Sequence, residues 1–335
     1  MQKRHVRIGT GIATVLLATA AFAEQRPEYG AMLEGFEYPF ELREHTLETQ
    51  GQTLSMAYMD VRPDGEGNGE TVVLLHGKNF CGATWQPTID VLLDAGYRVV
   101  APDQIGFCKS SKPEGYQFSF HQLAANTNSL LDELEIQDAI LVGHSMGGML
   151  AARYALSYPD DLSRLVLVNP IGLEDWQAEG VPYATIDALH ETERKTNFES
   201  IKAYQQDIYY NGDWRAEYDA PVEMLAGMYA GPDGDLVALN QAQTSDMVFT
   251  QPVVHEFANL DVPTVLMIGM LDRTAPGAAR AAPEVAERLG NYAELGRSAA
   301  AAIPQADLIE FDDLGHSPQM EAPERFHESL LRAID

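Results

Sequence analysis

The hydrophobic pattern of residues 71–170 alternates between short, mainly apolar runs and longer segments with helical spacing. The apolar runs lie at residues 71–75, 97–101, 139–142 and 165–168. Runs of this length are typical of strands buried on both faces of a parallel sheet. One helix is predicted at about 85–95, where Gly96 ends it, and another begins after Ser119, which can cap it. Strands that alternate with helices predict a parallel sheet with helices on both faces.

The alternation stops after residue 170 and returns at residues 264–268, which again form an apolar run. The intervening residues 171–257 are rich in aromatic side chains. We expect them to form a mostly helical cap inserted into the sheet domain, with a second independent domain as the alternative. A last strand at 307–311 and a helix at 323–334, with Pro near its start, complete the predicted sheet domain.

The N-terminal part of the chain contains no such alternation. Residues 46–49 and 54–60 favour two strands of a hairpin, and residues 24–45 are expected to form a connecting arm. The first 23 residues resemble a secretory signal peptide, because a short apolar run at 8–20 precedes Ala21-Phe22-Ala23, an A-x-A cleavage site. The basic start of this segment is formed by Lys3, Arg4 and Arg7. We expect cleavage after Ala23 and a periplasmic or secreted protein, and an uncleaved membrane anchor is the alternative.

The charge of the chain restricts its partners. The chain has 22 Lys and Arg residues and 50 Asp and Glu residues, which gives a formal net charge of -28. Nucleic acid and anionic membrane surfaces are therefore poor partners, and we expect no stable membrane association after signal cleavage. Neither His-Glu-x-x-His nor a clustered Cys/His spacing occurs, so we expect no metal and no cofactor. The oligomeric state is left open.

Candidate chemistry centres on Ser145, which stands in the sequence Gly-His-Ser-Met-Gly at residues 143–147. The Gly-x-Ser-x-Gly spacing lies between a predicted strand and a predicted helix. Glycines at these positions allow a sharp turn that projects the serine hydroxyl above the sheet edge. Because a serine hydroxyl is a weak nucleophile, it needs a base within hydrogen-bond reach and a third group that orients the base.

At this point the chain resembles the α/β-hydrolase family from about Leu47 to its end. The resemblance rests on His76-Gly77 after an apolar strand, residues 101–106, the turn at Ser145, Asp272 after a late strand, and Gly315-His316. It implies an α/β-hydrolase fold with a mostly parallel central sheet, helices on both faces and an inserted helical cap. The expected divisions are 46–170 and 258–335 for the core and 171–257 for the cap.

Order in the chain selects the base and the acid. After a turn of this type the acid and then the histidine follow the serine. Of the nine histidines, His316 alone lies in a loop just after a late strand and is the expected base. The resemblance places the acid at Asp272, with Glu174 or Asp175 as the alternative position. Asp103 also ends a strand but precedes the serine, and we expect it to stabilise its loop.

The oxyanion of acyl transfer requires two N–H donors. The backbone amide of Met146, directly after the nucleophile, is one candidate. The resemblance implies that the residue after His76-Gly77 supplies the other, which here is Lys78, with Asn79 as the fallback. The Lys78 ammonium either reaches a polar group of the substrate or points to solvent.

Two cysteines, Cys81 and Cys108, each follow a predicted strand by a few residues. In the resembled fold these strands are neighbours, and an exported chain meets an oxidising compartment, so we expect a disulfide. Two free buried thiols are the alternative. Cys108 also stands where the family's loop usually has glycine.

These features together predict a serine hydrolase that cleaves a carboxylic ester or lactone through an acyl-enzyme intermediate. Epoxide and haloalkane hydrolases need a carboxylate at the position of Ser145 and are disfavoured. An aminopeptidase or amidase and a C–C bond hydrolase use the same three residue types and remain alternatives. A ligand-sensing protein with slow turnover and a metal hydrolase are weaker alternatives. The aromatic cap suggests an apolar or aromatic substrate group, unless those rings pack on one another.

Overall fold

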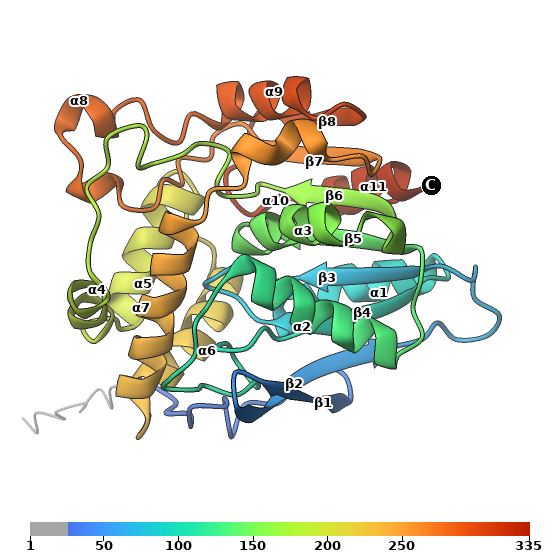
Figure 1. The fold of residues 1–335 in the computed structure, drawn as a ribbon, viewed down its shortest axis with the longest axis horizontal. Helices are drawn as coiled ribbons and strands as arrows, with labels where there is room; N and C mark the ends of the chain where they lie inside the picture. The colour runs from blue at the N-terminus through green and yellow to red at the C-terminus, as the bar shows by residue number, and fades with distance from the viewer. Residues whose placement is uncertain (1–25) are drawn as a thin grey trace, which may run out of the picture.

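A computed structural model describes residues 26–335 and shows one sheet flanked by helices (Figure 1). Within these residues the sheet has eight strands in the order β1-β2-β4-β3-β5-β6-β7-β8. The strand β2 runs antiparallel to both of its neighbours, and all other adjacent pairs are parallel. The strands are β1 (Leu42–Thr49), β2 (Gln52–Val61), β3 (Thr71–Leu75), β4 (Arg98–Pro102), β5 (Ala139–His144), β6 (Leu162–Val168), β7 (Thr264–Gly269) and β8 (Ala306–Phe311). The predicted mostly parallel sheet is confirmed.

The central strands are apolar on both faces because each face carries its own core. Val73 and Leu75 of β3 belong to one buried cluster, and Val72 and Leu74 belong to the other. Alternate residues of a strand point to opposite faces, so an uninterrupted apolar run is the sequence that a doubly covered sheet requires.

Helices cover both faces, as the alternation of elements predicts. One face is covered by α2 (Phe120–Glu133), α3 (Met146–Ser157) and α9 (Tyr292–Ala302), and the other by α1 (Gln86–Asp94) and α11 (Pro323–Ile334). The side chain of Ser119 accepts a hydrogen bond from the Gln122 amide at 3.0 Å and caps α2, as expected.

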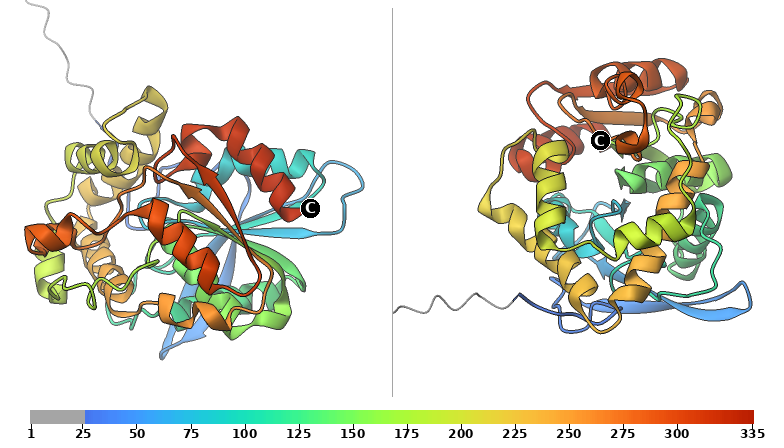
Figure 2. Two further views of the ribbon diagram at one scale, coloured as in Figure 1. Left: turned by 90° about the horizontal axis from the view of Figure 1, so that it is seen from above. Right: turned by 90° about the vertical axis from the view of Figure 1, so that its left-hand side faces the viewer.

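Four helices between β6 and β7 occupy the segment that the sequence assigns to the cap. They are α4 (Ile186–Glu193), α5 (Phe198–Tyr204), α6 (Asp219–Ala230) and α7 (Gly234–Thr250), and a π-helix, Gln205–Tyr209, continues α5. Figures 1 and 2 show them gathered at the end of the molecule to which the parallel strands point. The cap therefore lies over the carboxyl edge of the sheet.

Several element boundaries differ from the prediction. The hairpin begins at Leu42, inside the segment predicted as an arm. The helix α9 continues through Gly296, which packs against Ile268 and does not end it. The short helix α10 (Pro318–Glu321) was not predicted, and another short helix, α8 (Pro283–Ala286), lies between β7 and α9. None of the described helices is both long and apolar enough to cross a bilayer. The predicted signal peptide lies outside the described residues.

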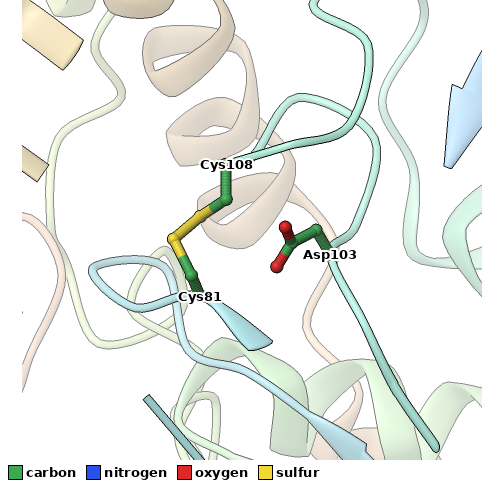
Figure 3. A group of neighbouring side chains, drawn as sticks. All are labelled: Cys81, Asp103 and Cys108. Atoms are coloured by element: carbon green, nitrogen blue, oxygen red, sulfur yellow. A yellow bond between two sulfur atoms is a disulfide. The ribbon is translucent and has the colours of Figure 1, made fainter. Parts of the chain in front are cut away.

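The loops after β3 and β4 are joined at Cys81 and Cys108, whose sulfur atoms are bonded in the structure (Figure 3). Their Cα atoms are 5.9 Å apart, within the usual range for a disulfide. Asp103 lies beside them and accepts hydrogen bonds from the Gly82 amide at 2.8 Å and the Lys109 amide at 3.0 Å. Asp103 thus stabilises both loops. The Asp103 carboxylate lies near both sulfur atoms, a grouping that could hold a metal ion if the cysteines were thiolates. Because the sulfurs are bonded to each other, they are not thiolate ligands.

We predict that the denatured, unreduced mature protein contains no titratable thiol. The double variant Cys81→Ser/Cys108→Ser should lose about 3 to 4 kcal/mol of unfolding free energy, since the bond closes a loop with a separation of 27 residues. Thiol titration and urea denaturation measure the two quantities. Two reactive thiols per chain in the untreated protein would contradict the pairing.

Candidate active site

Ser145 occupies the sharp turn between β5 and α3. Its backbone has φ +56° and ψ −121°, a conformation that costs energy for a residue with a side chain. The two flanking glycines are required by close packing. A Cβ on Gly143 would collide with the Gly147 carbonyl, and a Cβ on Gly147 would collide with the Leu75 carbonyl. The predicted turn is therefore present, and its hydroxyl lines a cavity.

Three side chains from separate parts of the chain meet at this turn. His316 Nε2 lies 2.9 Å from Ser145 Oγ, and His316 Nδ1 lies 2.6 Å from Asp272 Oδ2. Asp272 and His316 are completely buried. A carboxylate accepts hydrogen bonds, so Nδ1 carries the proton and Nε2 is free to accept the serine proton. The structure brings together the serine, histidine and aspartate that the sequence singles out.

Asp272 is held by two further donors. Asn169 Nδ2 donates to Oδ2 at 3.0 Å, and the Thr274 amide donates to Oδ1 at 2.8 Å. Asn169 Oδ1 accepts from the Gly269 amide at 2.8 Å, which ties the ends of β6 and β7 together. Sequence reasoning missed this role, although a buried asparagine directly after an apolar strand was a usable signal.

The two alternative acids lie elsewhere. Glu174 accepts hydrogen bonds from Trp176 Nε1 and the Gly290 amide. Asp175 pairs with His255 Nε2 at 2.8 Å. Neither carboxylate contacts His316, so the geometry favours Asp272 over both.

The backbone of His316 is fixed from both sides. Its amide donates to the Tyr209 carbonyl at 2.9 Å, and His144 Nε2 donates to its carbonyl at 2.8 Å. The Tyr209 ring also lies against the imidazole, with the ring centres 4.2 Å apart. Burial holds the pKa of His144 well below its usual value, so this ring is a neutral donor and not a second base.

His76 has a similar structural role in the loop after β3. Its Nδ1 donates to the Gly77 carbonyl at 2.9 Å, and its Nε2 accepts from the Gln104 amide at 3.0 Å. Burial lowers the pKa of His76, which keeps the ring neutral. The ring therefore shapes the loop that begins with Gly77.

Glu321 supports the loop that carries His316. Its carboxylate accepts hydrogen bonds from the amides on both sides of the histidine, those of Gly315 at 3.0 Å and Ser317 at 3.2 Å. Burial nevertheless raises the pKa of Glu321 to about 7, and the nearby Asp272 adds to the effect. This glutamate was not identified from the sequence.

A cavity of about 460 Å³ opens above Ser145 between core and cap. Tyr204, Tyr209, Tyr229 and Phe249 of the cap line it. Other cap aromatics instead pack on one another, as in the ring cluster of Tyr210, Trp214 and Tyr218. Some aromatic residues of the cap thus line the cavity and others pack on one another, and Tyr209 does both.

The predicted amide donors lie beside Ser145 in the chain or on the cavity wall. Met146 begins α3, so its N–H belongs to the first turn and has no partner within the helix. Lys78 and Asn79 line the cavity together with Ser145. The Asn79 side chain donates to the Tyr209 hydroxyl at 2.9 Å and joins the loop to the cap. The Lys78 ammonium forms an ion pair with Glu193 of α4, with Nζ 3.0 Å from Oε1. It therefore does not simply point to solvent.

Comparisons with known proteins agree with this architecture. A family model described as alpha/beta hydrolase fold matches residues 70–217. The structure is similar to the crystal structure of a probable hydrolytic enzyme from Pseudomonas aeruginosa, with a TM-score of 0.91 and 57% sequence identity over 92% of this chain and 99% of that chain. The chain belongs to the α/β-hydrolase fold family.

Curated relatives differ in the activities for which they are named. One is a 2-hydroxy-6-oxononadienedioate/2-hydroxy-6-oxononatrienedioate hydrolase of Paraburkholderia phymatum, 29% identical over 84% of this chain and 91% of that protein. Another is a non-heme chloroperoxidase of Kitasatospora aureofaciens, 27% identical over 80% of this chain and 94% of that protein. Membership of the α/β-hydrolase family therefore supports a hydrolase without naming its substrate.

We predict opposite pH effects at a partly buried glutamate and a buried histidine of this α/β-hydrolase. The folded protein keeps a proton on Glu321 that the unfolded chain releases, so this group lowers stability as pH rises from about 4.5 to about 7. Burial lowers the pKa of His327 in α11 to about 4, so His327 raises stability as pH rises from about 4 to about 6.5.

The measurement is the unfolding free energy of wild type, Glu321→Gln and His327→Gln between pH 5 and pH 7. Relative to wild type, Glu321→Gln should gain about 2 kcal/mol over this interval, and His327→Gln should change in the opposite direction. Parallel pH curves for all three proteins would contradict the assignment.

Proposed function

We propose that the protein is an exported serine hydrolase that cleaves a carboxylic ester or lactone through an acyl-enzyme intermediate. The observation that carries the proposal is the buried chain of hydrogen bonds from Asp272 through His316 to Ser145 at the floor of a cavity. A serine with a correctly oriented neutral imidazole beside it is an activated nucleophile.

In the proposed reaction Ser145 Oγ attacks the carbonyl carbon while His316 Nε2 takes the hydroxyl proton. Asp272 stabilises the imidazolium that forms. The backbone amides of Met146 and Lys78 donate hydrogen bonds to the carbonyl oxygen as it becomes negatively charged. The dipole at the N-terminus of α3 stabilises the same charge. His316 returns the proton to the leaving alcohol, and a water molecule, deprotonated by the same imidazole, releases the acid.

The cavity supports a substrate of moderate size. A volume of about 460 Å³ is in the lower half of the range for small-molecule sites, and its wall is largely apolar, with Ile171, Leu189 and Leu225 beside the aromatic rings. An acyl or alcohol group with apolar or aromatic character fits these surroundings.

C–C bond hydrolysis is a second candidate, because a curated C–C hydrolase aligns with 84% of the chain. A panel of activated esters, lactones, anilides and vinylogous diketones discriminates between the candidates. Esters or lactones should give the highest kcat/KM. Preferential cleavage of the diketones would show that the same three residues catalyse C–C bond hydrolysis and would overturn the ester proposal.

We predict that Ser145→Ala loses at least about a thousandfold in kcat on an activated short-chain ester, because the covalent route is removed. A serine-directed fluorophosphonate should label the wild type and not this variant. Ser157→Ala, an exposed change on the same helix, is the matched control. Near-full activity of purified, folded Ser145→Ala would refute the mechanism.

Export is a further part of the proposal and predicts a mature protein that begins at Glu24. Expression of the full chain in a Gram-negative host, followed by fractionation and N-terminal sequencing, measures this. Recovery of an intact Met1 terminus in the cytoplasm would overturn export and leave the hydrolase proposal unaffected.

A further inference from the structure

The cavity wall beside Ser145 carries an ammonium group with spare hydrogen-bonding capacity. Lys78 Nζ lies 3.0 Å from Glu193 Oε1, and both side chains are largely buried, 20% and 17% exposed. An ammonium has three N–H donors, and Glu193 is its one hydrogen-bond acceptor within residues 26–335. Two donors therefore remain for a molecule that enters the cavity.

Glu193 has no comparable spare capacity. Its second oxygen, Oε2, accepts from the Tyr229 hydroxyl at 2.6 Å and from Thr196 Oγ1 at 3.5 Å. Burial alone would raise the pKa of Glu193, but the charge of Lys78 and the bonds from Tyr229, Lys78 and Thr196 outweigh it and lower the pKa. Burial and the Glu193 charge keep the Tyr229 hydroxyl protonated, with a pKa well above its usual value. Glu193 is thus an ionised anchor for the ammonium, and both of its oxygens accept hydrogen bonds from the protein.

The ammonium also belongs to the same residue as one of the two proposed oxyanion donors. In the proposed mechanism the backbone amide of Lys78 faces the oxyanion, so the ammonium lies within one lysine side chain of the scissile carbonyl. Asn79, the next residue, is already bonded to Tyr209, which limits the freedom of this loop. A substrate oxygen a few bonds from the carbonyl can reach the ammonium.

The charge balance favours an uncharged oxygen. Lys78 and Glu193 neutralise each other, and most of the surrounding wall is apolar. A carboxylate on the ligand would place a second negative charge next to Glu193. Arg280 also lines the cavity, but it bonds to the Pro182 carbonyl and pairs with neither Lys78 nor Glu193. A carbonyl, ether or hydroxyl oxygen accepts from the ammonium without that repulsion.

We propose that Lys78, held by Glu193, donates a hydrogen bond to a second, uncharged oxygen of the substrate, so that the enzyme prefers oxygen-bearing esters or lactones to simple alkyl ones. This inference rests on the proposed function and specifies its substrate class. Lys78 then has two functions, a backbone donor for the transition state and a side-chain donor for recognition.

The test compares matched ester pairs in which one methylene is replaced by an ether oxygen. On the acyl side these are p-nitrophenyl pentanoate and p-nitrophenyl β-methoxypropanoate, and on the alcohol side they are the butyl and methoxyethyl esters of one acid. The wild type should favour the ether member of at least one pair in kcat/KM. In Lys78→Met that preference should fall about tenfold, mainly through KM. Lys78→Arg should restore part of it.

Three further arms make the result decisive. Lys202→Met removes a lysine from a cap ion pair with Asp219 that does not line the cavity, and should leave the ether preference unchanged. Glu193→Gln should lower the preference by a smaller factor, and it replaces Lys78→Met if that variant does not fold. p-Nitrophenyl hemisuccinate should be a poor substrate for the wild type.

Equal losses on both members of every pair would show that the Lys78–Glu193 bridge only fastens the cap to the core, and would overturn the inference. A wild-type preference for the hemisuccinate would overturn the uncharged class. These outcomes are distinct from failure of the proposed function, in which Ser145→Ala would retain hydrolysis of all the esters.

Discussion

The sharp reversal of the chain at Ser145 is the constraint on which the rest of the site depends. A serine at φ +56° is stable here because its surroundings fix the turn at several points. The Ser145 amide donates to the Val168 carbonyl at 3.1 Å, and its carbonyl accepts from the amides of Gly148 at 2.9 Å and Ile171 at 3.1 Å. Hydrogen bonds to the end of β6 and to the residues around the turn therefore offset part of the conformational cost of exposing the hydroxyl.

That arrangement also explains why residues far apart in sequence share one site. Parallel strands end at the same sheet edge, so the residues that follow β3, β5, β6, β7 and β8 converge there. Lys78, Ser145, Asn169, Asp272 and His316 each follow one of these strands. The bond between Asn169 and Gly269 keeps two of the strand ends in register. Sheet topology, more than any local motif, determines the distances within the site.

The same reasoning separates what could be predicted from the sequence from what could not. Buried parallel strands require long apolar runs, and a turn like that at Ser145 requires glycines, so both leave a local signal. The support of His316 by Tyr209 and Glu321 leaves none, because it depends on how a π-helix and a short helix pack against a loop. The direction of the Lys78 ammonium likewise depends on Glu193, which lies 115 residues away in the chain.

The cap is therefore part of the catalytic arrangement and not only a cover for the cavity. Its π-helix supplies the carbonyl that accepts from the His316 amide and the ring that lies against the imidazole. Its α4 supplies the carboxylate that holds Lys78, and its Tyr209 hydroxyl accepts from Asn79. Displacement of the cap would break these contacts at both the histidine loop and the amide-donor loop. Substrate entry that moved the cap as one body would thus disassemble the site, so a passage between cap side chains, with the cap in place, is the route that preserves it.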